Sequence, residues 1–176
     1  MATPTGPWWS QVQGNALAQG DYLPGCLVPF FGPEFTDGAG NRDVLVKEYD
    51  CIVLTQSCDL ENDKASLVAL CPIHPLASFE EGNPHFARKG AWEEVRKGRA
   101  EGLHLVASMR EPGNNRACLV VDFREIYSLP IAHLKRHAGS LGLRWRLCAP
   151  YLEHFSQAFA RFFMRVGLPG GITPFN

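Results

Sequence analysis

Short apolar runs bounded by polar residues recur along most of this chain, and they predict strands more often than helices; residues 142–149 also alternate between apolar and polar positions. The runs are rich in valine, isoleucine and aromatic residues, and they end at glycine, proline, asparagine or aspartate, which favour turns. A short helix is predicted to begin at Pro7, because proline suits the first turn of a helix. The predicted strands cover residues 21–31, 44–56, 65–73, 103–108, 117–129 and 142–149.

The end of the chain has a different period. Apolar residues repeat there at intervals of three and four, which is typical of one face of an amphipathic helix. These residues are Leu152, Phe155, Phe159, Phe162, Phe163 and Val166. The sequence therefore predicts a C-terminal helix over residues 150–167, stopped by Gly167 and Pro169.

Residues 76–102 are charged and favour helix, with little apolar face, and they are predicted to form a surface insertion. No linker or internal repeat divides the chain, so residues 1–176 are predicted to form a single domain. Six or seven short strands with helices gathered late favour a mostly-β (α+β) fold, a small barrel capped by the C-terminal helix. Trp92 and Phe86 in the insertion are a candidate edge for a protein partner.

Charge and cysteine content indicate which ligands and which cellular compartment to expect. The 17 lysines and arginines nearly balance the 18 acidic residues, so any anion site must be a local arrangement of side chains. The chain opens without a basic, apolar leader and has no run long enough to span a membrane. Most of the six cysteines lie in apolar runs, where a free thiol behaves as a small hydrophobe. We expect a cytoplasmic protein with reduced thiols and no membrane partner.

Four stretches, in the order they occur, resemble the PemK/MazF family of bacterial toxins. They are QGDYLPG (19–25), CIVLTQ (51–56), LVALCPI (67–73) and CLVVDFREIYSLPIAHL (118–134). The C-terminal helix is similar to the one that closes the family's fold. The resemblance implies an SH3-like barrel, a toxin–antitoxin setting, RNA as partner and pairing of two copies into a homodimer.

The chain departs from the family at both of its catalytic positions. Where the family has an Arg-Pro pair before the central strand, this chain has Glu48-Tyr49-Asp50. Where the family has its catalytic threonine, this chain has Pro72-Ile73-His74. The resemblance therefore implies an RNA-binding module that does not cleave.

The turn Ser57-Cys58-Asp59, directly after an apolar strand, is the first candidate site. Cys58 would be a nucleophile with His74 or His104 as its base, because only the thiolate attacks. Asp59 and His74 complete the catalytic set, and Ser57 is a binding candidate in the same turn. The alternative is a capped turn, in which Ser57 or Asp59 bonds to the backbone and Cys58 packs inward.

A metal site is the second candidate. Cys58, Cys71 and His74 have C-x12-C-x2-H spacing, with His104 as a fourth ligand, and zinc takes four such ligands in a tetrahedron. The cofactor is accordingly zinc or none. Together with the cysteine hypothesis, this is the alternative to RNA binding, and whether the protein is an enzyme stays open.

The third candidate is a cationic face on the C-terminal helix. Arg161 and Arg165 lie opposite its aromatic stripe, together with His154. With Arg144 and Arg146 from the preceding strand they would bind RNA or another phosphate ligand, since arginine forms paired contacts with phosphate oxygens. The alternative is a solvated face with acidic partners.

Overall fold

A computed structural model describes residues 6–31, 44–62 and 64–164 of the chain. Its strands are β1 (Trp9–Val12), β2 (Tyr22–Phe30), β3 (Leu45–Val53), β4 (Leu67–Pro75), β5 (Leu103–Val106), β6 (Leu119–Asp122), β7 (Tyr127–Pro130) and β8 (Arg144–Leu147). Its helices are α1 (Ser57–Glu61), α2 (Leu76–Gly82), α3 (Ala91–Arg96), α4 (Ile131–Leu141) and α5 (Tyr151–Phe163), with 3-10 turns at Pro84–Ala87 and Asn115–Ala117.

The described strands form two antiparallel sheets. In the larger sheet the order is β2-β3-β4-β6-β5, and β7 pairs with the first half of β4 while β6 pairs with its end. In the smaller sheet β1 pairs with β8. Of the mostly-β (α+β) class predicted from the sequence, the α+β part is confirmed. No pairing joins edge strands β2 and β5 over the described residues, so the larger sheet is not closed into the expected SH3-like barrel.

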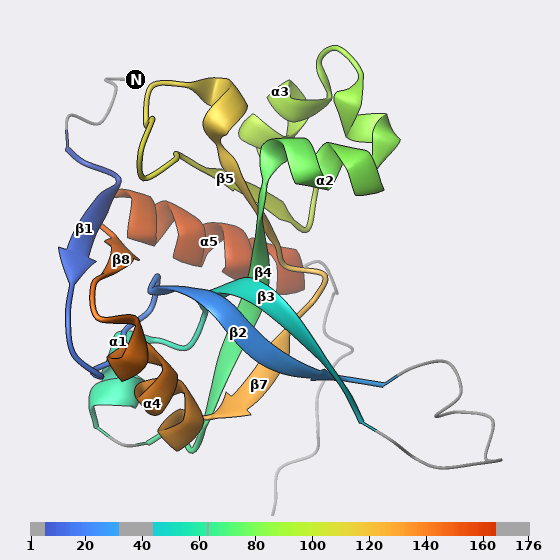
Figure 1. Ribbon diagram of the computed structural model, residues 1–176. Coiled ribbons are helices and arrows are strands. Elements are labelled where there is room, and N and C mark those ends of the chain that lie inside the picture. The colour runs from blue at the N-terminus through green and yellow to red at the C-terminus, as the bar shows by residue number, and fades with distance from the viewer. Residues whose placement is uncertain (1–5, 32–43, 63, 165–176) are drawn as a thin grey trace, which may run out of the picture.

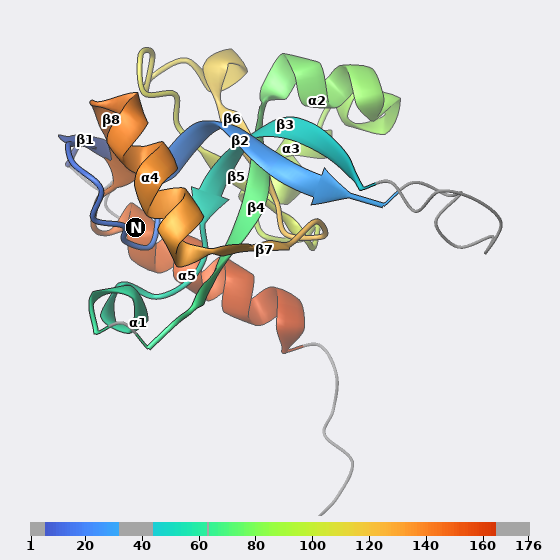
Figure 2. The ribbon, with the colours of Figure 1, turned by 60° about the horizontal axis from the view of Figure 1, so that its bottom comes forward.

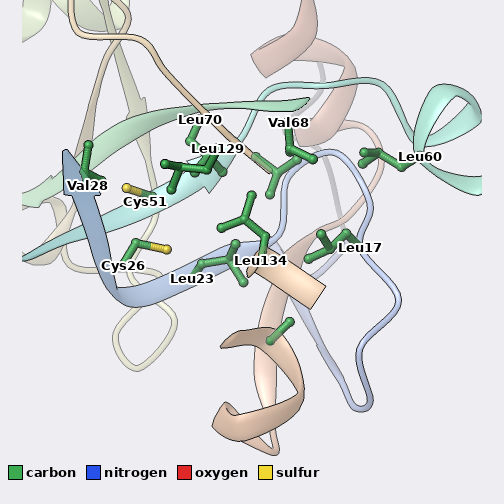
Figure 3. Packing of buried hydrophobic residues seen from close by; sticks show 12 residues of the cluster. Leu17, Leu23, Cys26, Val28, Cys51, Leu60, Val68, Leu70, Leu129 and Leu134 are labelled. Carbon is green, nitrogen blue, oxygen red and sulfur yellow. The ribbon is translucent and has the colours of Figure 1, made fainter. Parts of the chain in front are cut away.

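Alternation along the central strands fills both faces of the larger sheet. Cys51 and Val53 of β3 belong to one buried cluster, with Leu134 of α4, and Figure 3 shows this cluster. Ile52, between them, belongs to a second cluster, with Phe155 of α5. Successive side chains of a strand point to opposite faces, so α4 covers one face and α5 the other (Figure 1).

Helix α5 lies within the predicted range 150–167, and positions 165–167 fall outside the described residues. Much of its predicted stripe packs inward: the rings of Phe155 and Phe159 lie 5.7 and 5.5 Å from that of Phe123, which follows β6, whereas Phe163 is more than half exposed. No helix in the described part of the chain combines the length and the apolar character needed to cross a membrane.

The helix predicted from Pro7 is wrong, because these residues form strand β1. Trp9 pairs with Leu147 of β8 and donates its indole N–H to the Ala107 carbonyl at 2.7 Å. Trp8 stacks on Tyr151 of α5 at 3.6 Å between ring centroids. Partners more than 90 residues away therefore decide the conformation here, over a local helix signal.

The predicted insertion, residues 76–102, folds into α2, the Pro84–Ala87 turn and α3 at one end of the larger sheet (Figure 1). It packs on β5 and β6 through a third buried cluster, in which Phe86 and Trp92 are half-buried against Phe79. Trp92 also donates its indole N–H to Glu80 at 2.7 Å.

Figure 2 shows β2 and β3 as a long antiparallel pair that points away from α1 and α4.

Candidate functional site

The polar residues after β3 serve mainly to hold the chain together. Thr55 Oγ1 accepts the N–H of Ala69 in β4 at 2.8 Å. Ser57 Oγ accepts the N–H of Gln19, which precedes β2, at 3.1 Å. Unpaired backbone N–H groups are costly to bury, so these hydroxyls stabilise the end of the central strand. The Ser57 binding candidate therefore has a structural role.

Cys58 lies in α1 and is exposed, unlike the other five cysteines, all of which are described and are buried or half-buried. Its thiol lies 3.8 Å from Gln56 Oε1 and 3.8 Å from Asp59 Oδ1, and these are its hydrogen-bond partners among the described residues. Both are oxygens, and neither is the basic nitrogen that a cysteine nucleophile needs.

The structure does not bring the histidine partners to Cys58. His74 is at the other end of β4, where its ring lies 5.8 Å from that of Phe79 in α2. Helix α1 and helix α2 are at opposite ends of the molecule in both views (Figures 1 and 2). His104 is on β5, and its ring packs beside Phe123.

The four candidate metal ligands likewise lie in different parts of the fold. Cys71 is fully buried, and burial raises the pKa of its thiol well above the usual value, which opposes the thiolate that zinc binds. Across residues 6–31, 44–62 and 64–164, no three histidine, cysteine or acidic side chains are close enough to hold a metal ion. Cys58, Cys71, His74 and His104 are therefore not brought together as a ligand set.

Arg144 and Arg146 both pair with Asp21, Arg144 fully buried and Arg146 partly exposed, which corrects the expectation that they share an exposed surface with Arg161. The Arg144 guanidinium is fully buried, lies 3.3 Å from Asp21 Oδ2 and donates to the carbonyls of Gly14 and Ala16. Arg146 forms a two-point contact with the same carboxylate. One buried carboxylate between two guanidiniums is a structural cluster, because a ligand from solvent cannot reach Arg144.

Arg161 lies elsewhere, on the rim of a pocket of about 540 Å³ between β5, α5 and the segment that follows α3. His104 lines the same pocket, so the structure brings together two residues that the sequence assigned to different sites. Arg165 lies outside the described residues. The lining residues are Val95, Arg96, Lys97, Gly98, Ala100, Glu101, Gly102, Leu103, His104, Phe123, His154, Ala158, Arg161, Phe162 and Met164.

Helix α5 forms one wall of the pocket through positions four and three residues apart. His154, Ala158 and Arg161 project on the same side of the helix, as positions i, i+4 and i+7 do. The small side chain of Ala158 leaves the hollow open between the two larger ones. Arg161 donates from Nε to the Gln157 carbonyl at 3.3 Å, and no described carboxylate forms an ion pair with its guanidinium.

His104 is the unusual group in this pocket. Its Nε2 is closed off from solvent and has no hydrogen-bond partner in the described chain. An unpaired buried polar group costs about 1–3 kcal/mol. Burial, followed by the charges of His154 and Arg161, lowers the pKa of His104 to about 4, so the imidazole is neutral at pH 7. A neutral imidazole offers a ligand one donor and one acceptor nitrogen.

The opposite wall adds two cations that sequence reasoning missed. Arg96 pairs with Glu93 at 2.6 Å, and Lys97 reaches the same carboxylate oxygen at 3.3 Å. Exposed pairs of this kind are weak and can rearrange around a ligand. In sequence these residues belong to a charged surface segment, and no local signal shows that the fold brings them opposite Arg161.

Comparison with protein-family models, with curated proteins and with solved structures finds no match to this chain. The resemblance to PemK/MazF proteins therefore stays a prediction, and the site must be interpreted from its own residues.

Proposed function

We propose that the protein is a cytoplasmic, nucleic-acid-associated module of the PemK/MazF-like toxin or defence type, which binds single-stranded RNA without cutting it. The observation that carries the proposal is the position of Arg161 on the rim of the pocket, with no carboxylate partner in the described chain. Lys97 and Arg96 add positive charge across the opening. A protein with a net charge of −1 depends on such a local cluster to bind a phosphate backbone.

The absence of cleavage is proposed from the family's catalytic positions. Asp50, near the place of the family's arginine, accepts hydrogen bonds from the Tyr22 hydroxyl and the Gly25 N–H. Pro72 pairs in register with Cys51 inside the sheet. Both positions therefore have structural roles in this chain, and neither supplies a cation or a hydroxyl for phosphoryl transfer. The SH3-like relationship and pairing of two copies belong to the same proposal.

The test is a fluorescence-anisotropy titration of a labelled single-stranded RNA at low and moderate salt. We expect Arg161→Ala to weaken binding and to reduce the slope of log affinity against log salt by about one. Arg136→Ala is the matched control, because Arg136 is an exposed arginine on α4, away from the pocket. Absence of binding at low salt, or equal effects of both variants, would overturn the proposal.

Cysteine-dependent or metal-linked chemistry at Cys58 is the second candidate function. The observation that favours it is the exposure of this thiol in a protein whose other cysteines are at least half-buried. Metal content of the purified wild type beside Cys58→Ser tests the metal version. Stoichiometric zinc that disappears in the variant would support it, and equal metal content in both proteins would remove it.

A further inference from the structure

We infer that the pocket is a mononucleotide site, in which a nucleobase packs against His104 and Phe162 while its 5′-phosphate binds Arg161. This inference rests on the proposed function, because it names the part of the RNA that the pocket takes. The same chemistry is present in a free nucleoside monophosphate and in the 5′-terminal nucleotide of an RNA chain.

The first argument is that the pocket has two chemically different halves. Phe162 and Ala158 supply an apolar wall, backed by the fully buried ring of Phe123, whereas Arg161 and Lys97 supply positive charge at the opening. Inorganic phosphate would leave the aromatic wall unused, and an apolar molecule would leave the cations uncompensated. A nucleotide combines a flat ring with a single anionic group, and aromatic side chains bind bases by stacking.

The second argument is the unpartnered nitrogen of His104. Its ring lies nearly parallel to that of Phe123, at 6.2 Å between centroids and 21° between planes, so the imidazole is held in place by packing. Nε2 meets no hydrogen-bond partner in the described chain. The edges of nucleobases carry donors and acceptors, and one of these can form a single hydrogen bond with Nε2 once a side chain that covers this buried nitrogen shifts. Met164 at the rim is highly exposed and can move aside to admit a ring.

The third argument concerns which cations of the pocket lining already form ion pairs. Arg96 and Lys97 share the carboxylate of Glu93, and Glu101 brings a negative charge to the lining. Arg161 is then the cation whose charge a ligand can use without breaking an ion pair of the described chain. One guanidinium matches one phosphate in a two-point contact, so the pocket suits a monophosphate better than a polyphosphate.

The backbone conformation at Gly102, just before β5, supports a preformed binding site. Gly102 has a φ of +83°, and a Cβ at this position would lie 3.1 Å from Phe162 Cε2 and 2.8 Å from Arg124 Cγ. Only glycine combines this conformation with so close an approach. The absence of a side chain at Gly102 therefore lets Phe162 close against the loop and form the aromatic wall.

The test is calorimetric titration of the full-length protein with the four ribonucleoside 5′-monophosphates, ribose 5-phosphate and inorganic phosphate. We expect at least one nucleotide to bind about tenfold or more tightly than ribose 5-phosphate, because of base stacking. His104→Phe keeps the packing on Phe123 and should weaken nucleotide binding while leaving ribose 5-phosphate binding unchanged. Arg161→Ala should weaken both, and Arg136→Ala neither.

Ala158→Phe is a second variant that does not depend on His104. Ala158 is half-buried on α5 and lines the hollow, so a phenylalanine there should fill it and abolish nucleotide binding, while thermal unfolding close to that of the wild type checks that the fold is kept. Nucleotides that bind no better than ribose 5-phosphate, or wild-type nucleotide affinity in Ala158→Phe, would overturn the inference.

Parallel titrations with 5′-phosphorylated and 5′-hydroxyl RNA separate this inference from the proposed function. RNA binding without any nucleotide preference overturns the mononucleotide site and leaves the proposed function standing. Nucleotide binding without RNA binding supports the site, with a free nucleotide as its ligand, and overturns the RNA proposal. Absence of both overturns both.

Discussion

Arg144 of β8 and Asp21 before β2 form an ion pair with both side chains completely shut off from solvent, at 3.3 Å between Nη2 and Oδ2. The two residues are 123 positions apart, and Arg146 binds the same carboxylate from two places further along β8. Charges are costly to bury unless they are paired and hydrogen-bonded, and the carbonyls of Gly14 and Ala16 complete the partners of Arg144. This cluster ties the smaller sheet to the larger one.

Asp21→Asn should therefore be strongly destabilising. The amide keeps the shape of the carboxylate but leaves the buried Arg144 without a counter-charge, which we expect to cost about 3–5 kcal/mol. The free energy of unfolding in urea measures the loss. Glu94→Gln is the matched control, because it breaks the exposed pair with Arg99 and should leave the unfolding midpoint unchanged. Equal stability of both variants would contradict the structural role of the cluster.

Gly20→Ala should destabilise the turn before β2, next to this cluster. Gly20 has a φ of +80°, and a Cβ there would lie 2.8 Å from Leu152 Cδ1 and 3.0 Å from Leu147 Cβ. We expect a loss of about 1–3 kcal/mol, from the left-handed backbone and from the displaced leucines. Thermal unfolding beside Gly82→Ala checks it, since an alanine at Gly82 meets nothing within 4 Å. A Gly20→Ala protein as stable as Gly82→Ala would refute the packing at this turn.

The folded protein should lose stability in mild acid because of His104. Its pKa is lowered to about 4 in the folded state, mainly by burial, and is near 6.5 in an unfolded chain. Between pH 6.5 and 4 the unfolded state therefore binds a proton that the folded state does not. The contribution of His104 to the free energy of unfolding is complete above about pH 6.5. Up to about 3 kcal/mol of it is lost as the pH falls to 4. Urea unfolding across this range should show a shallower fall for His104→Gln, and parallel curves would exclude the effect.

Cys58 should be the first cysteine to react in the native protein. Its thiol is exposed, whereas Cys51 and Cys71 are buried in the core; the pKa of Cys51 is raised by its hydrogen bond with Cys26 and by burial, and that of Cys71 mainly by burial. Titration with a disulfide reagent should give one rapid equivalent, and Cys58→Ser should remove it. Cys118→Ser should leave the rapid phase intact, because Cys118 is half-buried and burial raises its pKa. A rapid phase that survives Cys58→Ser would contradict the exposure of this thiol.

Elements with a strong local period were predicted well. The helix that carries the aromatic stripe of α5 and the strand formed by the apolar run at Cys51, Ile52 and Val53 follow from positions a few residues apart. Strand β8 shows the limit of such patterns. The alternation of Leu143, Trp145 and Leu147 with Arg144 and Arg146 indicates arginines on an exposed face, yet Arg144 is as fully buried as Leu147, and Leu143 is more than half exposed. The distant carboxylate of Asp21 pairs with Arg144 and allows it to be buried, and the local alternation does not reveal this partner.

The sequence by itself determined the α+β class, the aromatic stripe of the last helix and the charged segment 76–102, and it indicated Arg161 and His104 only as separate candidates. Only the tertiary structure decided that these two residues line one pocket, that Arg144 and Arg146 face Asp21, and that Cys58 and His74 are apart. Periodicity is a property of neighbours along the chain. A site depends on contacts between segments brought together by folding, here β5, α5 and the residues after α3.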